Sequence, residues 1–311
     1  MLKSFEEIMQ AVVSQPRKRL AVANAASLSS LQAALAAQQQ DLADPVLFGA
    51  RAEIDRLAGE GGLDLSGTEI VDAPDELEAA RLATRAVSEG RADLLMKGFI
   101  HTDDFLRAVL DKEAGLRTGS IMSHVFLLEL PGRLLLVTDG AMNIAPDLVT
   151  KAAIIMNAVY LAHVLGLTEP KVGVLAATEL VNPAMPSTLD AAALATMETR
   201  GQFPACVVDG PFALDNAVSP EAARLKKIPG PVAGNCDILL APDIEAGNAL
   251  AKSWAFLAGG RLAGVLVGAA APVVLTSRAD SDQAMLHSIA LAVLMAQMKR
   301  DSRLKVGRVH Y

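Results

Sequence analysis

The chain contains few cysteines, few aromatic side chains and no cluster of basic residues, and each shortage excludes a class of protein. Its two cysteines among 311 residues, Cys206 and Cys236, are not a close pair. They suit a reducing compartment and exclude both a disulfide scaffold and a cysteine-rich zinc site. The formal net charge is −7 and no basic arm is present, which argues against nucleic acid as the main partner.

Long apolar stretches are missing as well. Residues 1–10 include Lys3, Glu6 and Glu7 and lack the apolar core of a secretory signal. The longest apolar run, residues 262–275, contains several small residues and Pro272 and is too short for a membrane helix. We therefore expect a cytoplasmic protein without a membrane partner.

The chain alternates short apolar segments with longer segments of helical periodicity. Hydrophobic residues make up 52% of it and aromatic residues only 4%, so Ala, Val, Leu and Gly must fill the core. Segments that are apolar throughout are typical of strands covered on both faces, and the alternation predicts βαβ units with a mainly parallel sheet. The expected strands are residues 20–24, 45–49, 94–97, 134–138, 172–176, 205–209, 238–241, 264–267 and 273–276. The expected helices are residues 75–89, 102–111, 147–165, 187–199, 245–258 and 281–298.

The most informative segment is residues 272–283, where a strand is followed by a polar turn and then a helix. Ser277 and Arg278 directly precede the helix, where free backbone N–H groups and the helix dipole favour an anion. The guanidinium of Arg278 matches the oxygens of a phosphate group. The alternative is that Asp280 only caps the helix and that Arg278 is solvated.

Other polar residues follow expected strands, and ligands of open parallel sheets collect at such carboxyl ends. Asp139 and Asn143 follow one strand, and Glu245 and Asn248 follow another, so all four are candidates for lining a cleft. For the second pair the alternative is a capped helix start. Ser187, with Asp190 three residues later, is typical of a helix N-cap.

Three cations, Lys97, Arg107 and Arg117, fall within one segment and together are suited to the phosphates of a nucleotide. A solvated helix face is the alternative. Histidine offers no comparable pattern, because the five histidines lack metal-ligand spacing, and we expect no metal site. Cys206 lies in an apolar segment and is expected in the core rather than as a nucleophile.

A series of short segments between about residues 2 and 296 recurs in one order in the phosphate acetyl/butyryltransferase family, which the chain resembles over nearly its whole length. Its butyryltransferase-like branch is the most similar. The segments are Met96-Lys-Gly98, Phe105-Leu-Arg107, Gly115-Leu-Arg-Thr-Gly119, Met122-Ser-His-Val125, Val181-Asn-Pro-Ala-Met-Pro-Ser-Thr-Leu-Asp-Ala-Ala192, Cys206-Val-Val-Asp-Gly-Pro211, Ile244-Glu-Ala-Gly-Asn248 and Ala271-Pro-Val-Val-Leu-Thr-Ser-Arg-Ala-Asp-Ser281.

The resemblance implies a two-lobed α/β fold like that of isocitrate and isopropylmalate dehydrogenases, with mainly parallel sheets, flanking helices and an active cleft between the lobes. One lobe would hold residues 1–141 plus 268–311, and the other residues 142–267. It also implies a homodimer that moves a short acyl group, acetyl or butyryl, reversibly between coenzyme A (CoA) and inorganic phosphate. The CoA would be a substrate, with no tightly bound cofactor.

The resemblance also suggests roles for particular residues. Ser277 and Arg278 match the family's Ser-Arg pair at the phosphate and thiol end of the cleft. Acetyltransferase members have an aspartate seven residues after that serine as the base, whereas this chain has Ala284. Asp280 is a nearby acid and the remaining catalytic candidate. Arg107, Arg117 and Lys97 are the candidates for binding CoA.

Rival functions remain open on the sequence. A metal- and NAD(P)-dependent hydroxy-acid dehydrogenase of related fold needs clustered aspartates, and we find none in one segment. A catalytically inactive CoA-binding paralogue is supported only by Ala284. An enzyme that takes its acyl group from acyl carrier protein is a third, weaker possibility.

Overall fold

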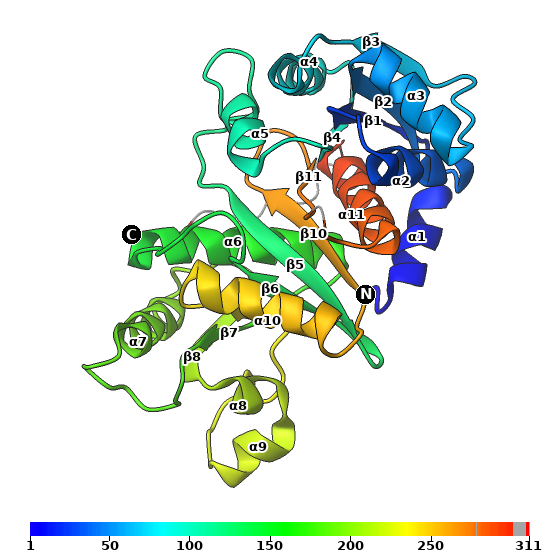
Figure 1. Ribbon diagram of the computed structural model, residues 1–311. Helices are drawn as coiled ribbons and strands as arrows, with labels where there is room; N and C mark the ends of the chain where they lie inside the picture. Colours follow the sequence, from blue (N-terminus) through cyan, green and yellow to red (C-terminus); the bar gives the residue numbers. More distant parts are fainter. Residues whose placement is uncertain (278, 301–308, 311) are drawn as a thin grey trace. The chain divides into compact units, whose positions relative to one another are not determined.

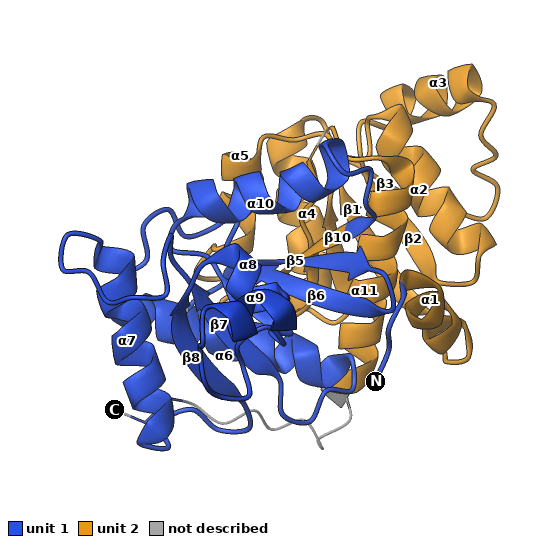
Figure 2. Cartoon of the chain, turned by 90° about the horizontal axis from the view of Figure 1, so that it is seen from below, with its two compact units in different colours: residues 1–4, 121–262, 301–311 blue, residues 5–120, 263–300 orange. Residues whose placement is uncertain are grey.

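The computed structural model describes residues 1–277, 279–300, 309 and 310, without the side chains of residues 299 and 300 (Figure 1). The chain divides into two compact units (Figure 2). Among the described residues, unit 1 holds 1–4, 121–262, 309 and 310, and unit 2 holds 5–120 and 263–300. The lobe boundaries expected after residues 141 and 267 differ from the limits of these units and stay a prediction.

Unit 2 is built on a mainly parallel sheet with the strand order β3-β2-β1-β4-β11-β10. The register of β1 against β2 and β4, of β4 against β11, and of β2 against β3 is parallel, and only β10 and β11 pair in antiparallel fashion. The strands are β1 (Lys18–Ala23), β2 (Ala43–Gly49), β3 (Glu69–Asp72), β4 (Leu94–Lys97), β10 (Leu262–Val267, with its first residue in unit 1) and β11 (Val273–Val274). The helices are α1 (Phe5–Val13), α2 (Leu28–Gln39), α3 (Arg51–Gly61), α4 (Glu76–Ser88), α5 (Thr102–Val109) and α11 (Asp282–Arg300).

Unit 1 repeats the plan with the strand order β5-β6-β9-β7-β8. An antiparallel hairpin of β5 and β6 continues into parallel pairs of β6 with β9, β9 with β7, and β7 with β8. The strands are β5 (Ser123–Leu130), β6 (Arg133–Thr138), β7 (Lys171–Leu175), β8 (Val207–Phe212) and β9 (Ile238–Leu240). The helices are α6 (Leu148–Val164), α7 (Pro186–Thr199), α8 (Leu214–Val218), α9 (Pro220–Leu225) and α10 (Ile244–Phe256).

Helix α11 is the central helix of unit 2. Nearly all of its residues between 284 and 296 are buried, as expected for a helix that is apolar on every side. It packs against α1 and α2, and the ring of Phe5 stacks on His287 with centroids 4.1 Å apart. The Gly264 N–H donates to Ser288 Oγ at 2.9 Å, which fixes α11 on β10.

The α/β class and the mainly parallel pairing predicted from the sequence are confirmed, and all the expected strands and helices are present with shifted ends. The prediction missed two strands and several helices. Strand β3 has exposed ends and no apolar run, and α2 is rich in Ala and Gln without a clear apolar face. The missed elements are β3, β5, α1, α2, α3, α8 and α9.

The expected cap at Ser187 was wrong. Helix α7 begins at Pro186, and its N-cap residue Met185 makes no side-chain hydrogen bond. Asp190 instead pairs with Lys151 of α6, whose ammonium lies 2.6 Å from Asp190 Oδ2 and whose side chain is only 6% exposed. This ion pair ties α7 to α6.

We expect the two ends of this pair to respond differently to mutation. Asp190→Ala leaves a buried ammonium without its carboxylate and should lower the free energy of unfolding by about 3 kcal/mol, the lower end of the range for a buried pair because Asp190 is partly exposed. Lys151→Met should cost less, because the half-buried Asp190 can then be solvated. Urea unfolding at pH 7, followed by circular dichroism, measures both. A larger loss in Lys151→Met would contradict this account.

Candidate active site

Two of the residues selected from the sequence line one small cavity in unit 2, at the ends of β4 and β11. Its volume is about 100 Å³, and both Lys97 and Ser277 border it. The same cavity is lined by three serines at the start of α2, Ser27, Ser29 and Ser30. The structure therefore places a cation and several hydroxyl groups around one space.

The backbone of the Ser277 turn is held by its own side chains. The Ser277 N–H donates to Asp280 Oδ2 at 2.7 Å, and the Asp280 N–H donates to the Ser277 carbonyl at 3.2 Å. The helix cap is made by Ser281, whose Oγ accepts from the Ala284 N–H at 3.2 Å, so the capping role considered for Asp280 was wrong. Arg278 lies outside the described residues.

Lys97 is held in place at the end of β4. It is only 5% exposed, and its Nζ donates to the carbonyls of Gly98 at 3.3 Å and Ile100 at 3.1 Å. The next residues are fixed on the end of β1, since the Phe99 N–H donates to the Asn24 carbonyl at 2.8 Å. The Asn24 Nδ2 donates back to the Phe99 carbonyl at 2.5 Å.

Gly98 is required for this close approach. A Cβ atom at Gly98 would lie 2.2 Å from the Asn24 carbonyl oxygen and 2.6 Å from that of Ala23. Both neighbours are backbone atoms of the sheet and cannot turn aside. The geometry that places Lys97 in the cavity therefore requires a glycine at position 98.

Asp139 and Asn143 form a second group, in unit 1. Asp139 is 2% exposed, and its carboxylate accepts four hydrogen bonds of 2.6–3.2 Å from the N–H groups of Ala141, Met142 and Asn143 and from Asn143 Nδ2. The same amide donates to the Met122 carbonyl at 2.9 Å. Here Asp139 organises the turn after β6.

The start of α10 packs on this turn. Asn248 Nδ2 donates to the Gly140 carbonyl at 2.9 Å, and a Cβ at Gly247 would lie 2.2 Å from the Asp139 carbonyl oxygen. The helix is capped by Asp243, which accepts from the Ala246 N–H at 2.8 Å. The helix start is therefore capped, and Glu245 is exposed on the first turn; a role of Glu245 in lining a cleft stays a prediction.

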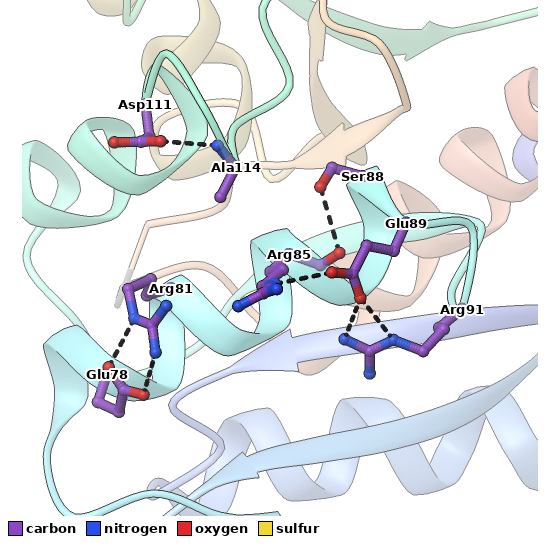
Figure 3. Close-up of polar contacts among 8 residues, drawn as sticks. All are labelled: Glu78, Arg81, Arg85, Ser88, Glu89, Arg91, Asp111 and Ala114. Atoms are coloured by element: carbon purple, nitrogen blue, oxygen red, sulfur yellow. Dashed lines mark hydrogen bonds and ion pairs between the residues drawn. The ribbon is translucent and has the colours of Figure 1, made fainter.

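Arg107 borders a different and larger pocket of unit 2, about 650 Å³, between α4, α5 and the segment that follows α5. Its side chain is 79% exposed and pairs with Asp104 at 2.6 Å. Arg81 and Arg85 of α4 border the same pocket and pair with Glu78 and Glu89 (Figure 3). Acidic side chains line it too, namely Glu89, Asp104, Asp111 and Glu113.

Arg117 borders neither of these two pockets and is exposed. The structure thus brings Lys97 together with Ser277, and Asp139 with Asn143 and Asn248. It does not bring Lys97, Arg107 and Arg117 into a single pocket.

The cysteines are unsuited to nucleophilic chemistry. Both are buried, and burial raises the pKa of each thiol to about 12. The thiolate, which is the reactive form, is therefore scarce at neutral pH. Among the described residues, no group of three or more His, Cys, Asp or Glu side chains is arranged to hold a metal ion. No helix in the same part of the chain is long and apolar enough to cross a membrane.

Comparison with known proteins identifies the family. The family model described as phosphate acetyl/butaryl transferase matches residues 4–81 and 76–293. The chain belongs to this family. It is 48% identical over 301 residues to a phosphate butyryltransferase of Clostridium acetobutylicum, covering 96% of this chain and 100% of the relative. It is also 48% identical over 281 residues to a phosphate acetyltransferase of Thermotoga maritima, covering 90% and 95%.

Solved structures agree with this assignment. A branched-chain phosphotransacylase from Enterococcus faecalis V583 aligns with a TM-score of 0.81 at 34% identity, over 90% of this chain and 99% of that one. A 4-hydroxythreonine-4-phosphate dehydrogenase from Klebsiella pneumoniae, 14% identical with a TM-score of 0.57, shows the dehydrogenase-like fold alone over 91% of this chain and 100% of that one. As a family member the protein is a phosphate acyltransferase.

Sequence reasoning missed the serines that complete the small cavity. The signal was present, because a Ser-Leu-Ser-Ser run begins three residues after an expected strand and is typical of a helix N-cap. Ser27 does cap α2, accepting from the Ser30 N–H at 3.2 Å. Without α2 among the expected helices, nothing connected these hydroxyls to Ser277.

Substitution of Gly98 tests whether activity depends on the close approach of β1 and β4. Gly98→Ala should lower the free energy of unfolding by about 1–3 kcal/mol, the usual cost of overpacking, and should sharply reduce acyl-transfer activity by displacing Lys97. The matched control is Gly59→Ala on α3, where a Cβ meets no atom within 4 Å and should be neutral or slightly stabilising. Thermal melting and activity of both variants check this, and a fully active Gly98→Ala protein would contradict it.

Proposed function

We propose that the protein transfers a short acyl group reversibly between CoA and inorganic phosphate, at the end of unit 2 that carries Ser277. An oxygen of phosphate attacks the thioester carbonyl, the carbon–sulfur bond breaks, and the products are acyl phosphate and CoA. The observation that carries the proposal is the cavity that Ser277 shares with Lys97, in a chain of this family.

The acyl group is proposed to range from acetyl to butyryl, including branched chains. The chain is as similar to an acetyltransferase as to a butyryltransferase, 48% in each case. One methylene in an apolar pocket is worth only about 1–3 kcal/mol, so a family member can use several acyl groups.

In this proposal Ser277 and Arg278 act at the reacting centre. The Ser277 hydroxyl and neighbouring N–H groups stabilise the negative oxygen of the tetrahedral intermediate. The Arg278 guanidinium binds phosphate through paired donors. Transfer within one ternary complex needs no protein nucleophile, which agrees with two buried thiols of raised pKa. Much of the rate then comes from holding two substrates together.

The larger pocket beside Arg107 is proposed to bind the nucleotide part of CoA. Its volume of about 650 Å³ lies in the usual range for such ligands. The ion pair of Arg107 with Asp104 is exposed and therefore weak, so the guanidinium can exchange its carboxylate for a phosphate at little cost. Arg81 and Arg85 extend the same surface, and Arg117 is proposed as a further contact.

Asp280 is proposed to position the Ser277 turn, since its carboxylate accepts the Ser277 N–H. Asp139, Asn143, Asn248 and Glu245 of unit 1 are proposed as cleft-lining residues. We also propose that the protein works as a cytoplasmic homodimer without a metal ion or a tightly bound cofactor. A hydroxy-acid dehydrogenase is not favoured by any observation, and an inactive paralogue is supported only by Ala284.

The purified protein should release free thiol from acetyl-, propionyl-, butyryl- and isobutyryl-CoA only when phosphate is present, with EDTA having no effect. The matched variant is Arg278→Ala, which should lose about 10²–10³ in rate because a preorganised donor is removed. Arg278→Lys should recover only part of the loss, because a point charge cannot replace the guanidinium. Tight CoA binding without turnover would favour the inactive paralogue, and NAD(P)-dependent oxidation would favour the dehydrogenase.

Asp280→Asn should keep most of the activity, because the amide oxygen can still accept the Ser277 N–H. Asp280→Ala should lose more, since the turn then lacks this acceptor. If the carboxylate only assisted ionisation of a thiol with pKa near 8.5, the loss in Asp280→Asn would be at most about 30-fold at neutral pH and would vanish above pH 8.5. The measurement is kcat of both variants across pH 6–9. A loss near 10³ that persists at high pH would assign Asp280 a larger catalytic role.

A further inference from the structure

Two pockets of unit 2 differ in size and in lining, and this difference separates the cations that the sequence grouped together. Lys97 borders the cavity of about 100 Å³ with Ser277, whereas Arg107 borders the pocket of about 650 Å³. Neither residue borders the other's pocket. A shared role in binding the nucleotide of CoA therefore does not fit both.

The cavity beside Lys97 has room for a small anion and not for a nucleotide. Drug-sized ligands occupy pockets of about 300–1,000 Å³, several times its volume. The group that must meet Ser277 in acyl transfer and has the right size is inorganic phosphate, or the phosphoryl group of the acyl phosphate in the reverse direction.

The chemistry of the cavity points the same way. Its described lining contains one ammonium group and the hydroxyls of several serines, and no carboxylate among them. The larger pocket is lined by three arginines and four acidic side chains, and its arginines are already paired with carboxylates. A small dianion is attracted to the cavity beside Lys97, whose described lining holds an ammonium group and no carboxylate.

The position of the ammonium is also set in advance. The carbonyls of Gly98 and Ile100 accept from Nζ, and the side chain is 5% exposed, so little conformational freedom is left to lose on binding. Ser30 is similarly ordered, because its hydroxyl is buried and accepts from Ser27 Oγ at 2.7 Å.

We propose that Lys97 is a phosphate-binding residue at the reacting end of the site, and that the serine hydroxyls at the start of α2, which line the same cavity as Ser277, complete this phosphate site. The proposal rests on the proposed function. Lys97 takes no part in proton transfer in this proposal. It neutralises the phosphate oxygens while another phosphate oxygen forms the bond to the acyl carbon and the thiolate of CoA leaves.

The test compares how a substitution changes the Michaelis constant (KM) for phosphate and the KM for acyl-CoA. Lys97→Met keeps the length of the side chain and removes its charge, and the KM for phosphate should rise roughly 10- to 100-fold, the worth of a hydrogen bond to a charged group. The KM for acyl-CoA should change less than about twofold. Arg107→Ala should show the reverse pattern, and Lys112→Met, at an exposed lysine outside both linings, should change neither constant.

Direct binding provides a second measurement that does not depend on turnover. Inorganic phosphate, added at constant ionic strength with chloride as the control anion, should raise the melting temperature of the wild-type protein and not that of Lys97→Met. If Lys97→Met does not fold, Lys97→Arg keeps the charge, and its KM for phosphate should rise while its KM for acyl-CoA stays unchanged.

The outcomes distinguish this proposal from the one on which it rests. Absence of any phosphate-dependent transfer in the wild-type protein defeats the proposed function. Active variants in which the acyl-CoA constant rises and the phosphate constant does not, or in which neither moves, defeat the role of Lys97 alone.

Discussion

The ends of β1 and β4 approach each other so closely that one position between them cannot carry a side chain. Gly98 lies against the carbonyls of Ala23 and Asn24, and the following N–H of Phe99 is bonded to the second of these. The ends of two parallel strands are thereby held together. The position of Lys97 depends on this contact, and the serines at the start of α2 line the same cavity.

Unit 2 contains two different electrostatic environments. At the strand ends, one buried ammonium and several hydroxyls surround a small space that contains no acidic side chain among its described residues. Between α4 and α5, exposed arginines are already paired with neighbouring carboxylates around a larger space (Figure 3). The small space has room for a small anion, and the larger one has a volume in the range of pockets that bind larger organic ligands.

The sequence was a good guide wherever its pattern was local. Uniformly apolar segments predicted the parallel strands, and the Ser-Arg turn was found because a strand, a turn and a helix follow one another directly. Strand β3 was missed because only pairing with β2 makes its exposed Glu69 and Asp72 part of a sheet. Helix α2 was missed because it is buried on several sides and has no polar stripe to reveal its period.

The site was harder to predict because its parts come from distant segments. Lys97 and Ser277 are adjacent only because β4 pairs with β11, which no spacing in the sequence reveals. Lys97 and Arg107 are close in sequence, yet they face different pockets because the loop and helix between them turn the chain. Asp139 was expected to line a cleft, which stays a prediction, and the hydrogen bonds of its carboxylate to its own turn could not be foreseen because they depend on the path of the backbone.

The order of the segments along the chain has a consequence for biosynthesis. Unit 2 consists of residues 5–120 and 263–300, so the whole of 121–262 is translated before β10, β11 and α11 appear. Until then one edge of β4 has no partner strand, and the surfaces of α1 and α2 that α11 covers remain open to solvent. During translation, therefore, all the strands of unit 1 are made before unit 2 is complete. The cavity beside Ser277 forms last, and a chain that stops early cannot contain it.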